Sequence, residues 1–175
     1  MPPLASGDAW SAEQIDNLPF LEAVIQESLR FWSVVPRQTR LPIRPVTIAG
    51  EAIPPGTLLV NSFYATNRAT KNWGPDAATF RPERWLGSSE AKAYGGAKDR
   101  SAFSTFSHGA KSCIGYKFAH FEMLVFLAGL VGSFEWEFVD KPGLPPGVVK
   151  ADHDSTIMLK LDGGLQLKAT PVEGW

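Results

Sequence analysis

The residue of this chain best suited to chemistry is its single cysteine, Cys113, in the segment 106–115, which reads FSHGAKSCIG. This segment places an aromatic residue, a glycine, a cation, the cysteine and a second glycine in that order. The spacing suits a loop wrapped around one sulfur ligand, because the thiolate is the form of cysteine that binds metal. The segment therefore predicts a site for a metal-containing cofactor.

An apolar helix is expected directly after this loop. Over residues 114–133, apolar side chains recur on one helical face at Phe118, Phe121, Val125 and Ala128. Cys113 would then lie at the N-terminal end of that helix, where free N–H groups and the helix dipole favour an anion. The helix is thus expected to stabilise a thiolate.

The residues around the cysteine suit a flat ligand. Gly109 and Gly115 lack a Cβ and let the backbone approach such a ligand closely. Phe106 can shield the sulfur from water, and Lys111 can offer a cation to an acidic group of the ligand.

Other interpretations of the cysteine remain open at this point. A lone cysteine before an apolar helix is usually a small buried hydrophobe. His108 and His120 flank Cys113, so a zinc site or a cysteine hydrolase is conceivable. Structural zinc usually takes four ligands, however, and there is no second cysteine. For a hydrolase, no third group is evident that would orient the histidine.

Two upstream segments bear on the choice. A helix is expected over residues 17–33, with a cap at Asp16-Asn17 and apolar residues at Leu18, Leu21, Ile25, Leu29 and Trp32. Glu27 and Arg30 share a face of it, away from the apolar stripe. Such a pair is by itself typical of a solvated surface ion pair contributing well under about 1 kcal/mol. Residues 80–85 read FRPERW. Arg84 in this segment can bridge a carboxylate. Alternatively, the segment is a surface turn anchored by Trp85.

Taken in order, these three segments resemble the cytochromes P-450, the haem-thiolate monooxygenases. Residues 27–30 match the family's E-x-x-R, residues 82–85 its P-E-R-F-like segment, and residues 106–115 its F-x-x-G-x-R-x-C-x-G. Lys111 replaces the usual arginine, and Trp85 the usual phenylalanine. The resemblance implies the C-terminal third of a fungal or microsomal-type P-450, from the K helix to the L helix. That portion is mainly α with small β-sheets.

The resemblance also implies roles for individual residues. Cys113 would be the proximal axial ligand of the iron in haem b. Arg40, with Arg37 close by, would pair with a haem propionate. The other cofactor-binding residues would be Phe106, Gly109, Lys111 and Gly115, and the structural network would be Glu27, Arg30 and Arg84.

The expected organisation is a lead-in at residues 1–16 and a partial haem domain at 17–175. After the helix at 17–33, the domain would contain a small sheet at 43–62, a meander at 70–100, the cysteine loop at 103–115, the helix at 114–133 and C-terminal strands with a hairpin at 134–170. Within these parts we expect strands at 46–48 and 57–60, a short helix at 64–68, a patternless loop at 87–100, a half-buried strand at 134–138, and a hairpin with arms at 156–161 and 165–169.

The implied parent enzyme inserts one atom of O2 into a small, lipophilic organic substrate, using electrons from a reductase at its proximal face. Cations outnumber acids five to two over residues 87–120, which fits an acidic electron donor or a solvated basic loop. The family implies an endoplasmic-reticulum membrane location facing the cytosol, although residues 1–4 match neither a signal peptide nor a membrane span. A truncated gene product and a non-catalytic haem-binding fragment are alternatives.

Charge and cysteine content exclude other classes of protein. The net charge is −1 and the isoelectric point is near 6.3, so no basic surplus is present to neutralise nucleic-acid phosphates. A single cysteine excludes an internal disulfide framework.

Overall fold

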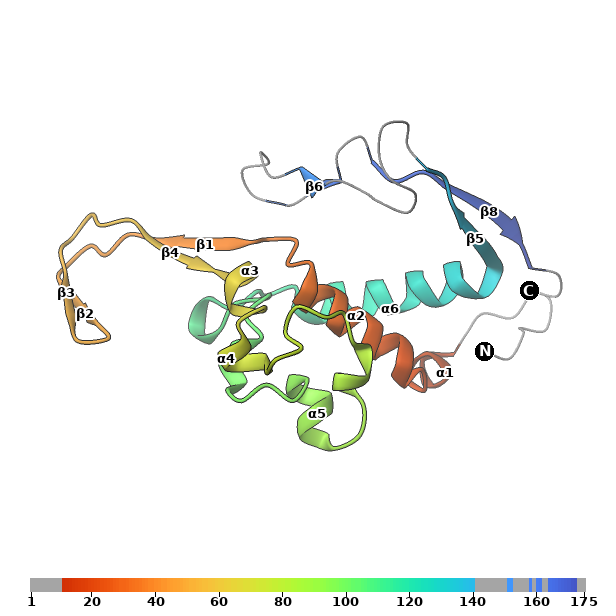
Figure 1. Ribbon diagram of the computed structural model, residues 1–175, viewed down its shortest axis with the longest axis horizontal. Coiled ribbons are helices and arrows are strands. Elements are labelled where there is room, and N and C mark those ends of the chain that lie inside the picture. Colours follow the sequence, from red (N-terminus) through yellow and green to blue (C-terminus); the bar gives the residue numbers. More distant parts are fainter. Residues whose placement is uncertain (1–10, 141–150, 153–157, 159, 162–163, 173–175) are drawn as a thin grey trace.

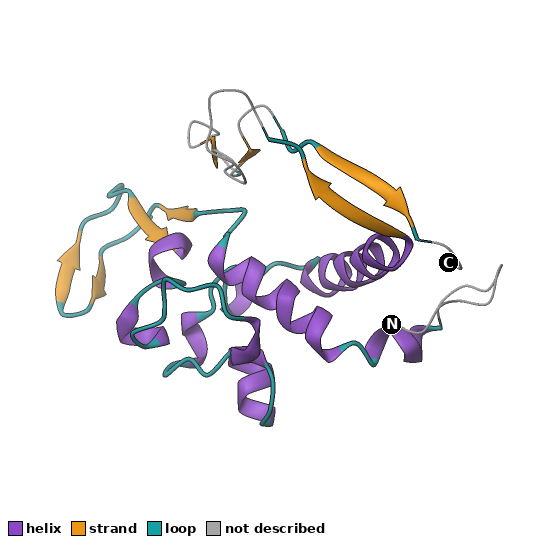
Figure 2. Ribbon diagram, turned by 45° about the vertical axis from the view of Figure 1, so that its right-hand side comes forward, coloured by secondary structure: helices purple, strands orange, loops and turns teal. Residues whose placement is uncertain are grey.

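Helices form the centre of the molecule, and two-stranded sheets lie around them (Figure 1). The computed structural model describes residues 11–140, 151–152, 158, 160–161 and 164–172. Helices α2 (Pro19–Phe31) and α6 (Tyr116–Ser133) contact each other at the centre. Short helices lie against the other side of α2 (Figures 1 and 2). The architecture is the mainly α one with small sheets that the sequence predicts.

Helix α2 occupies most of the segment 17–33 but begins without the predicted cap. Its N-cap is Leu18, which makes no side-chain capping bond. Asn17 instead closes a preceding helix, α1 (Ala12–Asp16), where its Nδ2 donates to the Glu13 carbonyl at 2.9 Å. Helix α1 begins with a capping box between Ser11 and Gln14. The segment treated as a lead-in therefore contains a helix of its own.

Two apolar clusters form the core on either side of α2. One contains the buried residues Ala23, Trp73, Ala77, Trp85 and Ala102. The other joins α1, α2 and α6 through Ile15, Ile25, Leu29 and Leu124. Because α2 contributes to both clusters, it is the element around which the other helices are positioned.

Helix α6 packs only in part through the predicted face, because Ala128 is buried but Phe118, Phe121 and Val125 are exposed. The buried residues are Leu124, Ala128 and Gly132, whereas Phe118 is 73% exposed and Phe121 is 50% exposed. The helix is apolar on nearly all sides, so periodicity alone does not select the buried face. Within the described ranges, no helix combines the length and apolar character that a membrane span requires.

The strands after α2 form an arm rather than one small sheet (Figure 1). Strand β2 (Val46–Ile48) pairs with β3 (Glu51–Ile53) across a turn at Ala49 and Gly50, which both have positive φ. Strand β4 (Leu59–Ser62) pairs with β1 (Arg37–Arg40), a strand that we did not predict. The predicted strand at 57–60 is thus shifted by two residues and belongs to a separate sheet.

The meander contains more helix than its sequence indicates. Helix α3 (Phe63–Thr66) corresponds to the short helix expected at 64–68, and α4 (Thr70–Trp73) and the 3-10 turn η1 (Pro82–Trp85) follow it. The predicted loop at 87–100 is wrong in part, because it contains α5 (Ser89–Tyr94). The Ser88 hydroxyl caps α5 by accepting from the Ala91 amide, and Gly95 ends it in the left-handed region.

Replacing Gly95 by alanine is expected to destabilise the protein by about 2–4 kcal/mol. Its φ is +60°, and an added Cβ would lie 2.9 Å from the buried Trp85 ring. The matched control is Gly96→Ala, because Gly96 also has positive φ but an added Cβ would meet no atom within 4 Å. Only the backbone cost of about 1 kcal/mol is expected there. Equal losses for the two variants in urea unfolding would contradict the steric part of the argument.

The C-terminal strands pair differently from the prediction. Strand β5 (Phe134–Phe138) pairs with β8 (Leu167–Pro171), and β6 (Ala151–Asp152) pairs with β7 (Lys160–Leu161). The predicted hairpin between 156–161 and 165–169 is therefore wrong in its pairing, and its residues 156–157, 159 and 162–163 lie outside the described residues. The alternation in β5 also does not produce a half-buried strand, since Trp136 and Phe138 are exposed.

Candidate cofactor site

The cysteine lies on a loop that is closed by backbone hydrogen bonds. The Cys113 amide donates to the Phe106 carbonyl at 2.9 Å, and the Ser112 amide donates to the Gly109 carbonyl at 3.0 Å. Ser107 and Gly109 have φ values of 61° and 77°, which let the chain turn back so tightly. The Cys113 side chain is exposed and its thiol is free, so the buried-hydrophobe interpretation is wrong.

The loop leads directly into α6. Gly115 is the N-cap of this helix, so Cys113 precedes the cap by two residues instead of adjoining a helix that begins at Ile114. The Phe106 ring, half-buried, packs against the Tyr116 ring with 6.0 Å between centroids. The site therefore presents the sulfur next to the N-terminus of a long helix.

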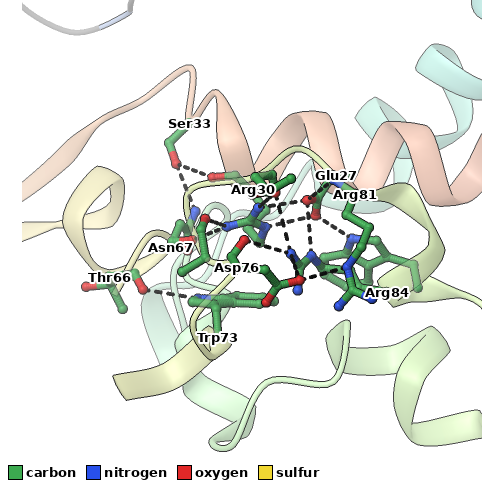
Figure 3. Close-up of polar contacts among 12 residues, drawn as sticks. Glu27, Arg30, Ser33, Thr66, Asn67, Trp73, Asp76, Arg81 and Arg84 are labelled. Carbon is green, nitrogen blue, oxygen red and sulfur yellow. Dashed lines mark hydrogen bonds and ion pairs between the residues drawn. The ribbon is translucent and has the colours of Figure 1, made fainter. Parts of the chain in front are cut away.

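Glu27 is the centre of a buried polar network (Figure 3). Arg30 donates to both of its oxygens, from Nη2 at 2.7 Å and Nε at 2.8 Å, and Arg84 Nε donates at 3.1 Å. The Arg81 amide and the Trp85 indole add bonds of 2.8 and 2.9 Å. Glu27 and Arg30 are 0% exposed, so the surface-pair interpretation is wrong.

Burial and hydrogen bonding act in opposite directions on this carboxyl group. Burial alone raises the pKa of Glu27, because it disfavours the charged form. The bonds from Arg30, the Arg81 amide and the Trp85 indole, with the charge of Arg30, outweigh burial and hold the pKa below its ordinary value. Glu27 is therefore an ionised acceptor shared by two arginines.

Arg30 also connects α2 to the segments that follow the arm. Its Nη1 donates to the Asn67 and Ala77 carbonyls at 2.7 and 2.8 Å, and its Nη2 donates to the Thr79 carbonyl at 3.0 Å. Arg84 extends the network to the Asp76 carboxylate at 3.2 Å. One buried arginine thus donates hydrogen bonds to three backbone carbonyls. These carbonyls lie in irregular segments, where the backbone hydrogen bonds of a helix or sheet do not satisfy them.

Asn67 links this network to the cysteine loop, and sequence reasoning missed it. Its Nδ2 donates to the Ser33 and Thr105 hydroxyls, each at 2.8 Å, while its Oδ1 accepts from the Ser104 amide at 3.2 Å. The Thr105 hydroxyl in turn donates to the Leu29 carbonyl at 2.9 Å. Asn67 is 0% exposed. An asparagine near a short helix carries no spacing signal that would have identified it.

The remaining predicted cofactor residues lie at the exposed edges of this region. Lys111 is exposed in the 3-10 turn η3 (Gly109–Lys111). Arg40 is exposed on β1, where its Nη1 bonds the neighbouring Thr39 carbonyl at 2.9 Å. Strand β1 contacts the cysteine loop through a different residue, Gln38, whose Oε1 accepts a hydrogen bond from Ser107 Oγ at 3.4 Å.

The geometry does not assemble the alternative cysteine sites. Among the described residues, no hydrogen bond joins Cys113 to His108 or His120, and His120 Nε2 instead lies 3.1 Å from Gln26 Nε2. The described part of the chain also contains no group of three or more His, Cys, Asp or Glu side chains placed to hold a metal ion. A hydrolase dyad and a zinc cluster therefore lack their geometry here.

A closed cysteine loop with an exposed thiol thus stands next to a buried Glu-Arg-Arg network, within a mainly helical fold. A sequence model of the family described as Cytochrome P450 matches residues 4–159, and the chain belongs to that family. It is 42% identical over 164 residues to the cytochrome P450 monooxygenase sphH of Aspergillus fumigatus, and 31% identical over 169 residues to buaD of Petromyces alliaceus.

Solved structures agree with the family assignment. The crystal structure of the cytochrome P450 CYP102L1 matches 95% of this chain with a TM-score of 0.73 and 31% identity. The retinoic acid-bound cyanobacterial CYP120A1 matches 93% with the same TM-score and 25% identity. The matches to sphH and buaD cover 94% and 96% of this chain, but the chain spans only 29% and 31% of those relatives.

The residues present fit the family's cofactor, haem b. A haem-thiolate site needs one accessible sulfur, and the thiol of Cys113 is free and exposed. Beside it, Ile114 and Phe118 expose apolar surface that a macrocycle could cover, being 104% and 73% exposed. An added Cβ at Gly109 or Gly115 would meet no atom within 4 Å, so the space beside the loop is open.

Proposed function

We propose that this chain supplies the thiolate side of a haem-thiolate monooxygenase and that residues 17–175 belong to its haem domain. The enzyme would insert one atom of O2 into a small, lipophilic organic substrate. The observation that carries this proposal is the placement of the only cysteine: Cys113 is exposed on a loop that its own amide closes. Family membership supports the same chemistry.

Cys113 Sγ would be the proximal ligand of the iron. Haem, when bound, supplies the redox chemistry that activates oxygen. Phe106, half-buried against Tyr116, would limit the access of water to the sulfur. Gly109 and Gly115 would leave room for the ring.

Two exposed cations would pair with the haem carboxylates. Arg40 can offer a planar, bidentate fork, and Lys111 a single point charge. Neither forms a salt bridge with a described acidic side chain, so no competing pair has to be broken first.

Glu27, Arg30 and Arg84 would act as positioning residues. None of them lies on the cysteine loop, but the Arg30 bond to the Asn67 carbonyl continues through the Asn67 side chain to Ser104 and Thr105. The cysteine loop would in this way be held by α2.

The electron donor would be a reductase with an acidic surface. Four exposed cations lie on and around the cysteine loop, at Lys98, Arg100, Lys111 and Lys117. Opposite charges of this kind steer association. For the whole enzyme we propose an endoplasmic-reticulum location facing the cytosol, as expected for the microsomal type.

Haem titration of the purified 175-residue chain tests the proposal. We expect uptake of one equivalent of haem and, after reduction under carbon monoxide, the red-shifted Soret band of thiolate-ligated iron. Absence of haem uptake, or a band typical of histidine ligation, would overturn the role of Cys113. Substrate turnover with an added reductase separates a catalytic chain from one that only binds haem.

A further inference from the structure

A concave site lies beside the cysteine loop, between α2, α5 and the start of α6. Its volume is about 420 Å³, within the range of small-molecule sites. The residues that line it are Gln26, Ala93, Tyr94, Arg100, Phe103, Phe106, Ser107, His108, Ser112, Cys113, Tyr116 and His120. Cys113, Phe106 and Arg100 carry roles proposed above, but none of those roles is the binding of a small ligand in this cavity.

The cavity and the exposed apolar surface lie on different sides of α6. Tyr116 and His120 line the cavity and, four residues apart, share one face of the helix. Phe118 lies about 200° around the helix from Tyr116 and does not line the cavity. A planar apolar cofactor covering Phe118 would therefore lie across α6 from Tyr116 and His120, although it would share Cys113 with the cavity.

The charge of the lining favours an anionic ligand. Arg100 and two histidines line the cavity, and no Asp or Glu does. Among the described residues, no carboxylate pairs with Arg100, whose guanidinium instead lies 5.1 Å from the Tyr94 ring centroid. The nearby Asp99 carboxylate is already engaged by the amide and hydroxyl of Ser101, at 2.7 and 2.6 Å.

His120 can supply a second donor. Gln26 Nε2 and His120 Nε2 lie 3.1 Å apart and form one hydrogen bond, so Nδ1 is the ring nitrogen that remains for a ligand. No hydrogen bond to Nδ1 is found within the described ranges. The remaining lining is rich in rings, with Tyr94, Phe103, Phe106 and Tyr116.

We propose that this cavity binds a small aromatic carboxylate at a site separate from the haem. The carboxylate pairs with Arg100 and with a donor from His120, and its ring packs against the aromatic lining. Since Cys113 also lines the cavity, such a ligand touches the segment that presents the sulfur.

Calorimetric titration of the haem-free 175-residue chain with 2-naphthoate tests the site. We expect a Kd of ~1 mM or tighter, and about tenfold weaker binding for Arg100→Gln, because a charge-assisted hydrogen bond is lost. The matched control is Lys98→Gln, which removes the same charge from a nearby exposed residue that does not line the cavity. Near-UV circular dichroism establishes that each variant is folded.

Further measurements keep the proposal falsifiable. Ala93→Trp, which fills the cavity from an exposed position of α5, is expected to abolish binding. Naphthoate is expected to bind the haem-loaded chain as well as the haem-free chain, without displacing haem. The proposal is overturned by absence of binding, by equal weakening in Arg100→Gln and Lys98→Gln, by equal affinity for the neutral naphthalene-2-carboxamide, or by competition with haem.

Discussion

Replacing Cys113 by serine is expected to abolish the thiolate-type spectrum of the haem-loaded chain completely. Serine preserves the size of the side chain and the bond from residue 113 to the Phe106 carbonyl, so the loop should keep its shape. The hydroxyl remains protonated at neutral pH and does not donate charge as a thiolate does. The measurement is the reduced carbon-monoxide difference spectrum of the wild-type chain and of Cys113→Ser.

Two further variants control for unspecific haem binding. The double variant Cys113→Ser/Ser112→Cys moves the thiol by one residue and should not restore the band, because the Ser112 amide is turned toward the Gly109 carbonyl. His120→Gln should leave the band unchanged, since His120 contacts Gln26. Identical spectra for the wild-type chain and Cys113→Ser, together with a changed spectrum for His120→Gln, would contradict the assignment of the ligand.

Replacing Glu27 by glutamine is expected to lower the free energy of unfolding by about 3–5 kcal/mol, the usual cost of removing one partner from a buried charge pair. Arg30 and Arg84 would remain buried without their counter-charge, and the new amide would present N–H donors to N–H donors. Urea unfolding measures the loss. The control is Glu22→Gln, an exposed residue in the first turn of α2, where the change should stay below about 1 kcal/mol.

The same carboxyl group makes stability depend on pH in a defined direction. Because the folded pKa of Glu27 lies below its ordinary value, the stabilisation is fully present above that ordinary value. It is lost as the pH falls through the folded pKa. Glu27→Gln should therefore remove a part of the acid sensitivity of the wild-type chain. A variant within about 1 kcal/mol of wild type at neutral pH would show that the network contributes little.

The motifs were sufficient to predict the family and the Glu27–Arg30–Arg84 contact. Glu27 and Arg30 are three residues apart on one helix, so their approach is local. Arg84 lies 57 residues from Glu27, yet Pro82 and the flanking aromatic residues mark the turn that presents it. The burial of this network was not evident, since a Glu-x-x-Arg pair has the same spacing on an exposed helix.

Other features depend on contacts that no local pattern encodes. Helix α6 is apolar nearly all round, so its buried face was set by the partners at Ile25 and Leu29 and not by its own periodicity. Strand β8 pairs with β5, and the two residues of its Glu137–Lys168 pair are 31 positions apart in the chain. The prediction had instead paired this segment with the nearer arm at 156–161, which was wrong. Asn67 bonds residues 34 and 38 positions away.

The sequence by itself determined the chemical identity of the site: one cysteine between two glycines, with an acid and two arginines in a fixed order. These residue types and short spacings are local properties of the chain. Only the tertiary structure decided that Glu27 and Arg30 are buried, that Asn67 connects them to the cysteine loop, and that a cationic cavity lies beside Cys113. Burial and long-range hydrogen bonds arise when distant segments exclude water together, and the position of a residue in the chain does not specify which segments those are.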